Sequence, residues 1–170
     1  MAEPQAIGEF EVLLRQHEAM VFSIAYHLLH DRTLAEEVAQ DVFLQLHGCL
    51  GNLQSAEHVV FWLRKVTVHR AIDAARSRRS RPELALDDIP EPSVPPDAPD
   101  PLLSARLRHL VASLPENARA VVVLRYQEEM GPDEIGRALG MPLATVKSTL
   151  QRALAMLRDK VSRSMGEVNI

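Results

Sequence analysis

The chain of 170 residues contains a single cysteine, Cys49, and no run of apolar residues long enough to span a bilayer. One cysteine can form neither an internal disulfide nor a cysteine-based zinc site, so we expect Cys49 to act as a small buried hydrophobic residue. The first ten residues carry acids and a proline, with neither a basic start nor an apolar run, which argues against a secretory signal. These absences predict a cytoplasmic protein with no direct membrane insertion.

Catalytic and cofactor-binding patterns are also missing. The seven histidines are scattered, and neither an HExxH pattern nor a phosphate-binding glycine loop occurs. The clustered carboxylates lie in a proline-rich stretch where nothing would desolvate them. The sequence therefore predicts no catalytic residue, metal site, cofactor or small-molecule substrate, and hence no enzyme.

The proline-rich stretch divides the chain. Residues 82–101 hold seven of the eleven prolines and six acids, with no Lys or Arg. Such a segment holds no helix and buries little apolar area, so we expect a flexible, extended linker. It separates residues 1–81 from a more basic part, residues 102–170, which have ten basic against seven acidic residues.

Both flanking parts are expected to be helical, because apolar residues recur three and four positions apart while strand-like alternation and hairpin dipeptides are missing. The first long helix is predicted over residues 9–30. Thr33 can cap the second helix, with Glu36 completing a capping-box pattern, and Gly48 lies near its end. After a short connection at 53–60, a third helix over 61–79 changes from apolar to cationic: residues 64–81 contain seven Lys or Arg and one acid.

In the second part, helices are predicted over residues 102–114 and 116–130, and two more follow closely. Gly131 and Pro132 suit the start of a short helix over 132–139. Gly140 supplies a tight turn before a last helix over 145–160. Four apolar side chains can form one seam across this turn, as a helix-turn-helix requires: Ile135, Leu139, Val146 and Leu150.

The outward face of the last helix combines short hydrogen-bonding side chains with cations, which suit base edges and phosphates: Thr145, Lys147, Ser148, Gln151 and Arg152. From this window alone, a DNA-reading helix and an ordinary solvated helix face remain alternatives.

The order of these segments resembles the sigma factors of bacterial RNA polymerase, in their extracytoplasmic-function group, over roughly residues 9–162. The stretch "AEEVAQDVF" is similar to the family's polymerase-binding helix, and "FWLRKVTVHRAIDAARSRR" is similar to its promoter-melting, minus-ten-reading segment. The stretch from "LPENARAVVVLRY" to "TVKSTLQRALAML" resembles its minus-thirty-five-reading domain. The resemblance implies an all-α fold of two small helical domains, residues 1–81 and 102–170, the second with a helix-turn-helix.

The resemblance also implies site residues. Core polymerase would bind an amide flanked by acids on the second helix, Glu37, Gln40 and Asp41. The opened minus-ten element would meet cations, a ring and polar groups on the third helix: Trp62, Arg64, Lys65, His69, Arg70, Asp73, Arg76 and Arg78. A cavity for a flipped base would border residues 52–60. The minus-thirty-five element would meet the last-helix face together with Arg119 and Arg125. For the acids and for part of the cationic cluster, plain solvation is the alternative, and Trp62 is better explained by packing.

Four positions depart from the family pattern. Thr149 and Leu154 stand where arginine is usual, and each missing cation is expected to weaken phosphate binding and flatten its salt dependence by about one unit of slope. His69 replaces the usual Asn, although histidine can still donate a hydrogen bond, and His47 stands where Trp is frequent.

The implied function is promoter-specific transcription initiation with core RNA polymerase and promoter DNA as partners, under the control of an anti-sigma factor. The linker could reach on the order of 65 Å between two promoter elements; it could equally be an inert spacer. The chain ends soon after the last predicted helix, so no further C-terminal regulatory domain is expected. A plain helix-turn-helix DNA-binding regulator and a sigma-like decoy that has lost promoter reading are the alternatives.

Overall fold

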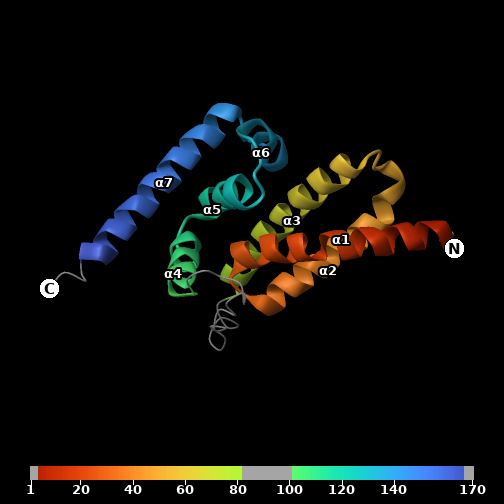
Figure 1. Ribbon diagram of the computed structural model, residues 1–170, viewed down its shortest axis with the longest axis horizontal. Helices are drawn as coiled ribbons and strands as arrows, with labels where there is room; N and C mark the ends of the chain where they lie inside the picture. Colours follow the sequence, from red (N-terminus) through yellow and green to blue (C-terminus); the bar gives the residue numbers. More distant parts are fainter. Residues whose placement is uncertain (1–3, 82–100, 167–170) are drawn as a thin grey trace. The chain divides into compact units, whose positions relative to one another are not determined.

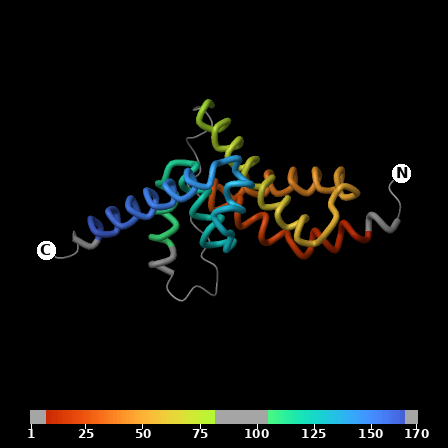
Figure 2. The backbone as a smooth tube through the Cα atoms, turned by 90° about the horizontal axis from the view of Figure 1, so that it is seen from above, coloured from red at the N-terminus to blue at the C-terminus, as the bar shows by residue number. Residues whose placement is uncertain are grey.

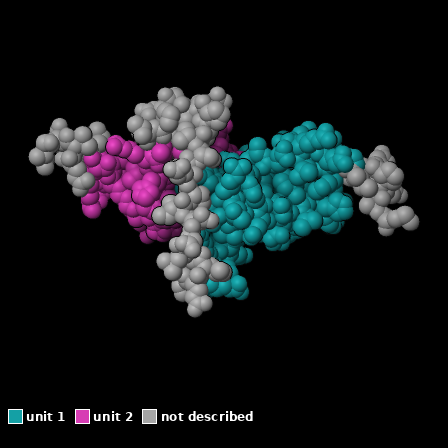
Figure 3. Space-filling model, turned by 90° about the horizontal axis from the view of Figure 1, so that it is seen from below, with its two compact units in different colours: residues 1–89 teal, residues 90–170 magenta. Residues whose placement is uncertain are grey.

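The computed structural model describes residues 4–81 and 101–166, and the side chains of residues 8–81 and 105–164 within them. These residues form helices and turns without a strand, in two compact units that divide near residue 89 (Figures 1 and 3). The all-α class and the two helical domains predicted from the sequence are confirmed. The predicted linker lies outside the described residues, except that a helix already begins at Pro101.

The first unit packs three helices, α1 (Pro4–Leu29), α2 (Arg32–Cys49) and α3 (Ala56–Arg79), with a short 3-10 turn, η1 (Leu50–Asn52), after α2 (Figure 1). Each helix buries one apolar stripe, as an amphipathic sequence must. The fully buried centre includes Ile24 from α1, Val42 and Leu46 from α2, and Leu63 and Val68 from α3. Cys49, expected to be buried, is only half-buried at the end of α2, and burial raises the pKa of its thiol.

The start of α2 differs from the prediction. The cap is Asp31, whose Oδ1 accepts a hydrogen bond from Leu34 N at 2.9 Å. Thr33 lies inside the helix, and Glu36 binds Arg32 at 3.1 Å instead of completing a capping box. His30 adopts a left-handed φ of 51° and turns the chain directly after α1, so that Asp31 reaches the capping position two residues before Thr33.

Asp31 has a second partner. Its Oδ2 lies 3.0 Å from Nη1 of Arg78 near the end of α3. One carboxylate therefore caps α2 and joins it to α3. Arg78, which was predicted to contact DNA, thus makes a structural contact within the first unit.

The start of α3 also corrects the prediction. Ser55 caps the helix by accepting a hydrogen bond from His58 N at 3.1 Å, so the predicted connection at 53–60 is helical from Ala56 onward. The first turn of α3 was not predicted, because residues 56–58 are exposed and lack the apolar recurrence that marks a helix. Of the residues 52–60 predicted to border a base-binding cavity, only 53–55 lie outside helical turns.

The second unit contains α4 (Pro101–Ala112), α5 (Glu116–Val122), a π-helical turn, η3 (Val123–Gln127), then α6 (Pro132–Leu139) and α7 (Leu143–Gly166). In Figure 2, α7 is a single unbroken helix. Ala118 and Val122 of α5 pack with Leu114 and with Ala153 of α7 in one apolar cluster. The helix predicted over 116–130 ends at Gln127, because Glu129 turns at a φ of 54° and Met130 folds back into the core.

The predicted helix-turn-helix is confirmed. Gly131 precedes Pro132 at the start of α6, and its N–H donates to Glu134 Oε2 at 3.0 Å. Gly140 ends α6 at a φ of 66°, a left-handed conformation that glycine adopts without strain. Of the predicted seam, Ile135 and Val146 are fully buried, while Leu139 and Leu150 are half-buried.

We predict that Asp31→Ala lowers the free energy of unfolding of the first unit by about 1–2 kcal/mol, because it removes both the cap of α2 and the partner of Arg78. Chemical denaturation monitored by the fluorescence of Trp62, the sole tryptophan, reports on this unit alone. Thr33→Ala is the matched control and should change stability by less than about 0.5 kcal/mol. If Thr33→Ala lowers the free energy of unfolding as much as Asp31→Ala does, Thr33 contributes to the cap and the assignment to Asp31 alone is wrong.

Candidate functional site

The predicted polymerase-binding residues share the outward side of α2. Glu37, Gln40 and Asp41 are all exposed, while Val38 and Val42 of the same helix are buried. Leu44 follows Gln40 by one helical turn and is 72% exposed. This side of α2 therefore offers two carboxylates, an amide and an apolar side chain to a partner.

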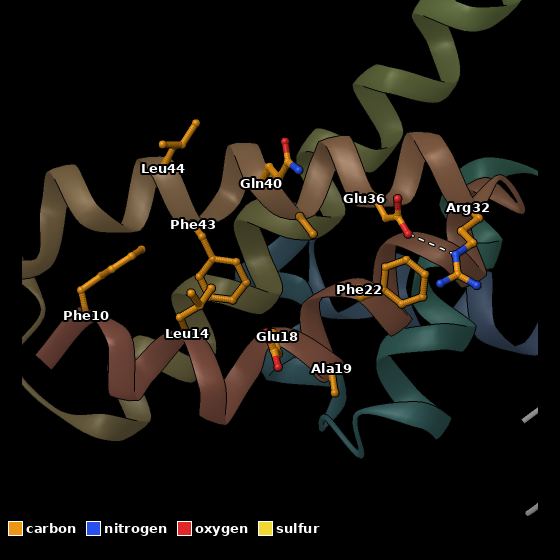
Figure 4. Close-up of a pocket in the computed structure, with 11 residues that line it drawn as sticks. Phe10, Leu14, Glu18, Ala19, Phe22, Arg32, Glu36, Gln40, Phe43 and Leu44 are labelled. Carbon is orange, nitrogen blue, oxygen red and sulfur yellow. Dashed lines mark hydrogen bonds and ion pairs between the residues drawn. The ribbon is translucent and has the colours of Figure 1, made fainter. Parts of the chain in front are cut away.

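A groove of about 740 Å³ runs between α1 and α2 beside these residues (Figure 4). Phe43 and Leu14 lie between the two helices, while Leu44 points away from α1 at the edge (Figure 4). Gln40 lines the groove, so the predicted polymerase-binding face and the groove are continuous. The groove was not predicted from the sequence, because it depends on the spacing of two helices. Leu44, an apolar residue on a polar helix face, was the available signal. The other lining residues come from α1 and the first turns of α2: Phe10, Glu18, Ala19, Phe22, Arg32, Glu36 and Ala39.

The eight residues predicted to meet the minus-ten element fall into two groups on α3. Four are exposed and recur four, four and three positions apart, which places them on one helix face: Lys65, His69, Asp73 and Arg76. Arg79 is exposed three residues further on and continues this cationic face. The same spacing in the sequence could have identified Arg79, which was not among the predicted residues.

The other four residues are half-buried within the first unit: Trp62, Arg64, Arg70 and Arg78. Arg78 binds Asp31, as described above. Arg70 reaches α2: its Nε and Nη2 donate to Oε1 of Gln45 at 3.1 and 2.9 Å, and Nη1 lies 3.6 Å from Oδ2 of Asp41. Arg64 lies close enough to His17 of α1 to affect its ionisation. The structure thus separates the cationic cluster into an exposed face and residues that contact neighbouring helices.

In the second unit, the predicted DNA-reading residues of α7 are brought together as expected. Thr145, Lys147, Ser148, Gln151 and Arg152 are all exposed, opposite the buried Val146 and Ala153. The Oγ of Ser148 donates to the Thr145 carbonyl at 3.1 Å, and Nε of Arg152 donates to the Ser148 carbonyl at 3.4 Å. Both side chains lie along the helix in the free protein, within reach of a ligand placed against this face.

Arg119 and Arg125 lie outside α7, and their guanidinium groups bind backbone carbonyls of the second unit. The Arg119 Nη2 donates to the carbonyl of Leu114 at 3.0 Å and to that of Ala112, across the turn between α4 and α5. Arg125 Nη1 donates to the Met130 carbonyl at 3.3 Å. Both guanidinium groups, predicted to meet the minus-thirty-five element, thus bind backbone carbonyls at turns of the second unit. Arg137 of α6, which was not among the predicted residues, is exposed and lines a small hollow with Leu143 at the start of α7.

The described residues contain no group of three or more His, Cys, Asp or Glu side chains that could hold a metal ion. None of their helices combines the length and the apolar character needed to cross a membrane.

Comparison with known proteins identifies the family. Sigma-70 region 2 matches residues 13–81, and Sigma-70 region 4 matches residues 104–157. The ECF RNA polymerase sigma factor SigE of Mycolicibacterium smegmatis is 32% identical over 171 aligned positions, and the RNA polymerase sigma-E factor of Streptomyces avermitilis is 31% identical over 153. The second alignment covers 90% of this chain and 85% of that protein. The chain belongs to the extracytoplasmic-function sigma factors of RNA polymerase.

This protein is therefore an alternative sigma factor, of the class that directs transcription initiation. It spans 65% of the length of the M. smegmatis relative, and that alignment covers 95% of this chain. The sigma factor RpoE of Bartonella quintana, solved with the anti-sigma factor NepR, shares the fold with a TM-score of 0.75 at 17% identity, over 91% of this chain and 97% of that one. CnrH, solved with the cytosolic domain of CnrY, shares it with a TM-score of 0.65 at 22% identity, over 91% of this chain and 88% of that one.

We predict that acid weakens the first unit of this sigma factor through His17. Burial, and secondarily the positive charge of Arg64, lower the pKa of His17 from its ordinary value of 6.5. The unfolded chain therefore binds this proton more readily, and the contribution to stability is present above about pH 6.5 and lost as the pH falls below it. Denaturation followed by Trp62 fluorescence from about pH 7.5 to about pH 5.5 should show a smaller pH dependence in His17→Gln. The exposed His58, changed to Gln, is the control; an unchanged pH dependence in His17→Gln would contradict this assignment.

Proposed function

We propose that this sigma factor binds core RNA polymerase through the outward side of α2, contacts the opened minus-ten element through α3 and reads the minus-thirty-five element through α7. The observation that carries the proposal is the division of partner-facing residues between two compact units. The first has an acidic face and a cationic face on different helices, and the second has a helix-turn-helix with an exposed polar helix. One chain can then hold a protein partner and two DNA elements at once.

The polymerase contact would combine charge and apolar area. Glu37 and Asp41 suit a cationic helical partner, for which electrostatic complementarity raises the association rate and sets specificity. Gln40 connects these acids to the groove between α1 and α2, where Leu44 offers apolar surface at the edge. A helix with cations along one side and apolar residues along another would fit this surface.

The minus-ten contact would use the exposed face of α3. Lys65, Arg76 and Arg79 can follow the phosphates of a separated strand, while His69 can donate a hydrogen bond to a base. Arg64 and Arg78 are assigned here to packing within the unit. Trp62 is half-buried, in agreement with a packing role rather than a stacking platform.

The minus-thirty-five contact would use α7. Thr145, Ser148 and Gln151 can read base edges, while Lys147 and Arg152 bind phosphates. Thr149 and Leu154, where the family pattern has arginine, are both half-buried. Because neither side chain carries a charge, we expect upstream binding to be weaker than a full set of cations would give.

We assign residues 1–81 and 102–170 as the two sigma domains and 82–101 as the linker that lets them reach separate promoter elements. The protein would work in the cytoplasm, where the polymerase performs all of the chemistry and the sigma factor uses no small-molecule substrate or cofactor. The complexes of RpoE with NepR and of CnrH with CnrY support an anti-sigma partner for this chain as well.

Run-off transcription on a randomised promoter pool, with purified core polymerase and with or without this protein, tests the proposal. We expect protein-dependent transcripts whose start sites share an upstream sequence. Core binding without transcripts, at adequate promoter coverage, would identify a sigma-like decoy. Tight duplex binding without core binding would identify a plain helix-turn-helix regulator.

We predict that Lys147→Ala lowers the salt dependence of promoter binding by the holoenzyme by about 0.9 units of slope, because one phosphate contact is lost. Arg163→Ala removes the same charge from an exposed, ion-paired position sixteen residues away, about 24 Å along α7, and should leave the slope unchanged. Binding titrated over a range of salt concentrations measures both.

Arg119→Gln should behave differently from Lys147→Ala. Because Arg119 binds the carbonyl groups at the turn between α4 and α5, its loss should lower the free energy of unfolding of the second unit by about 1–3 kcal/mol and leave the salt slope unchanged. Thermal unfolding by circular dichroism measures the first effect. A reduced slope with unchanged stability would instead place Arg119 at the DNA.

A further inference from the structure

The outward side of α7 carries an uncharged stripe along its centre. Ala144, Ser148 and Gln151 are all exposed, and they lie four and three positions apart, opposite the buried Val146. Ala144 supplies the apolar group of this stripe, and it lies in the first turn of a helix that begins at Leu143. The residue was not among those predicted to meet DNA.

The cations of α7 lie beside the stripe rather than within it. Counted at about 100° per residue, the exposed Lys147 and Arg152 lie about 70° to either side of it. The centre of a helix that enters the major groove meets the base edges, while its flanks come nearest to the phosphates. Because the commonest contact to guanine needs Arg or Lys, a central stripe without a cation favours other bases.

The hydroxyl of Ser148 is prepared to accept a hydrogen bond. It donates its own hydrogen to the Thr145 carbonyl, with 3.1 Å between the two oxygens, so its lone pairs remain for a ligand. The donors in the major groove are the amino groups of adenine and cytosine. Gln151 follows one turn later, and its amide is suited to pair with N6 and N7 of adenine. The two side chains together therefore favour adenine.

We propose that the centre of the α7 face reads A·T base pairs, with the methyl group of Ala144 against the 5-methyl group of a thymine and the Gln151 amide on an adenine. The inference rests on the proposed function, in which α7 reads the minus-thirty-five element, and it adds which bases are read and a further specificity-determining residue. An alanine methyl is among the groups that suit the thymine methyl, and the first turn of a recognition helix is the part that reaches base edges.

The length of the stripe sets the spacing of the two bases. From Ala144 to Gln151 the helix rises about 10 Å. Base pairs are stacked about 3.4 Å apart, so the thymine and the adenine lie within about three base-pair steps of each other. The upstream element of this sigma factor therefore contains a short A·T-containing core between the phosphates that Lys147 and Arg152 bind.

The test removes one methyl group from each side of the contact. Promoters that the holoenzyme transcribes are first selected from a pool randomised over the upstream element. Each thymine of the selected element is then replaced by deoxyuridine, which lacks only the 5-methyl group, and the Kd of the holoenzyme is measured. At one thymine the replacement should weaken binding about fourfold in wild type, the usual effect of one buried methyl group, and should have no effect in Ala144→Gly.

Comparison of the two DNAs within each variant removes other effects of the substitution. Ala144→Gly also lowers helix propensity, but this change acts equally on both DNAs and cancels in the ratio of the two Kd values. Ala155→Gly is the matched control, because it removes a methyl group from the exposed side of the same helix about 16 Å further along. It should retain the full fourfold effect of deoxyuridine.

The adenine contact is tested in the same way with 7-deazaadenine, which replaces the N7 acceptor by a carbon. At one adenine of the selected element this base should weaken binding about two- to tenfold in wild type and have no effect in Gln151→Ala. The wild-type measurements alone can contradict the inference, since they do not depend on the folding of any variant.

Three results would overturn the inference while leaving the sigma activity intact: a selected element of G·C pairs alone, wild-type binding that is insensitive to deoxyuridine at every thymine, or an equal loss in Ala144→Gly. If no transcript depends on the protein, the proposed function is contradicted. The selection and the modified duplexes are then repeated with the full chain alone, and the same loss at one thymine would still support the contact of Ala144. Failure to bind any duplex would overturn both.

Discussion

Burial of one stripe on each helix decides which side chains of this sigma factor remain available to partners. In the first unit, Val42 and Leu46 of α2 meet a core that also contains Leu63 and Val68 of α3. Once those residues face inward, helical geometry turns Glu37, Gln40 and Asp41 outward on one helix and Lys65, His69 and Arg76 outward on another. The surfaces proposed to face polymerase and DNA are thus consequences of the same packing.

Two acidic side chains of the first unit link local structure to these surfaces. Asp31 caps α2 and at the same time binds Arg78, so the start of α2 is joined to the end of α3. Asp41 approaches Arg70 in the middle of the same helix pair. Two pairs of opposite charges are therefore matched between α2 and α3 within the unit.

The second unit follows a tighter constraint, because α6 and α7 are joined by a turn of three residues. Gly140 supplies the left-handed backbone, and at Gly136 a Cβ atom would lie 2.8 Å from the Met141 carbonyl oxygen. The close approach of this turn to α6 fixes the direction of α7, since Ile135 and Val146 must both be buried. The exposed face with Thr145, Ser148 and Gln151 is held by a short, well-packed support rather than by a long loop.

The sequence by itself determined the helical class, the two domains, the helix-turn-helix and the family, because these depend on local periodicity, on proline and glycine positions and on the order of motifs. It also predicted that the polar residues of α7 share one outward face, since residues three and four apart on one helix share a side wherever that helix packs. Tertiary structure alone decided the rest. Asp31 replaced Thr33 as the cap because His30 turns the chain early, and Arg64, Arg70 and Arg78 left the cationic face because neighbouring helices bring acids, an amide and a histidine to them. The sequence shows that a side chain is cationic, but which group that side chain binds depends on the helix that packs beside it.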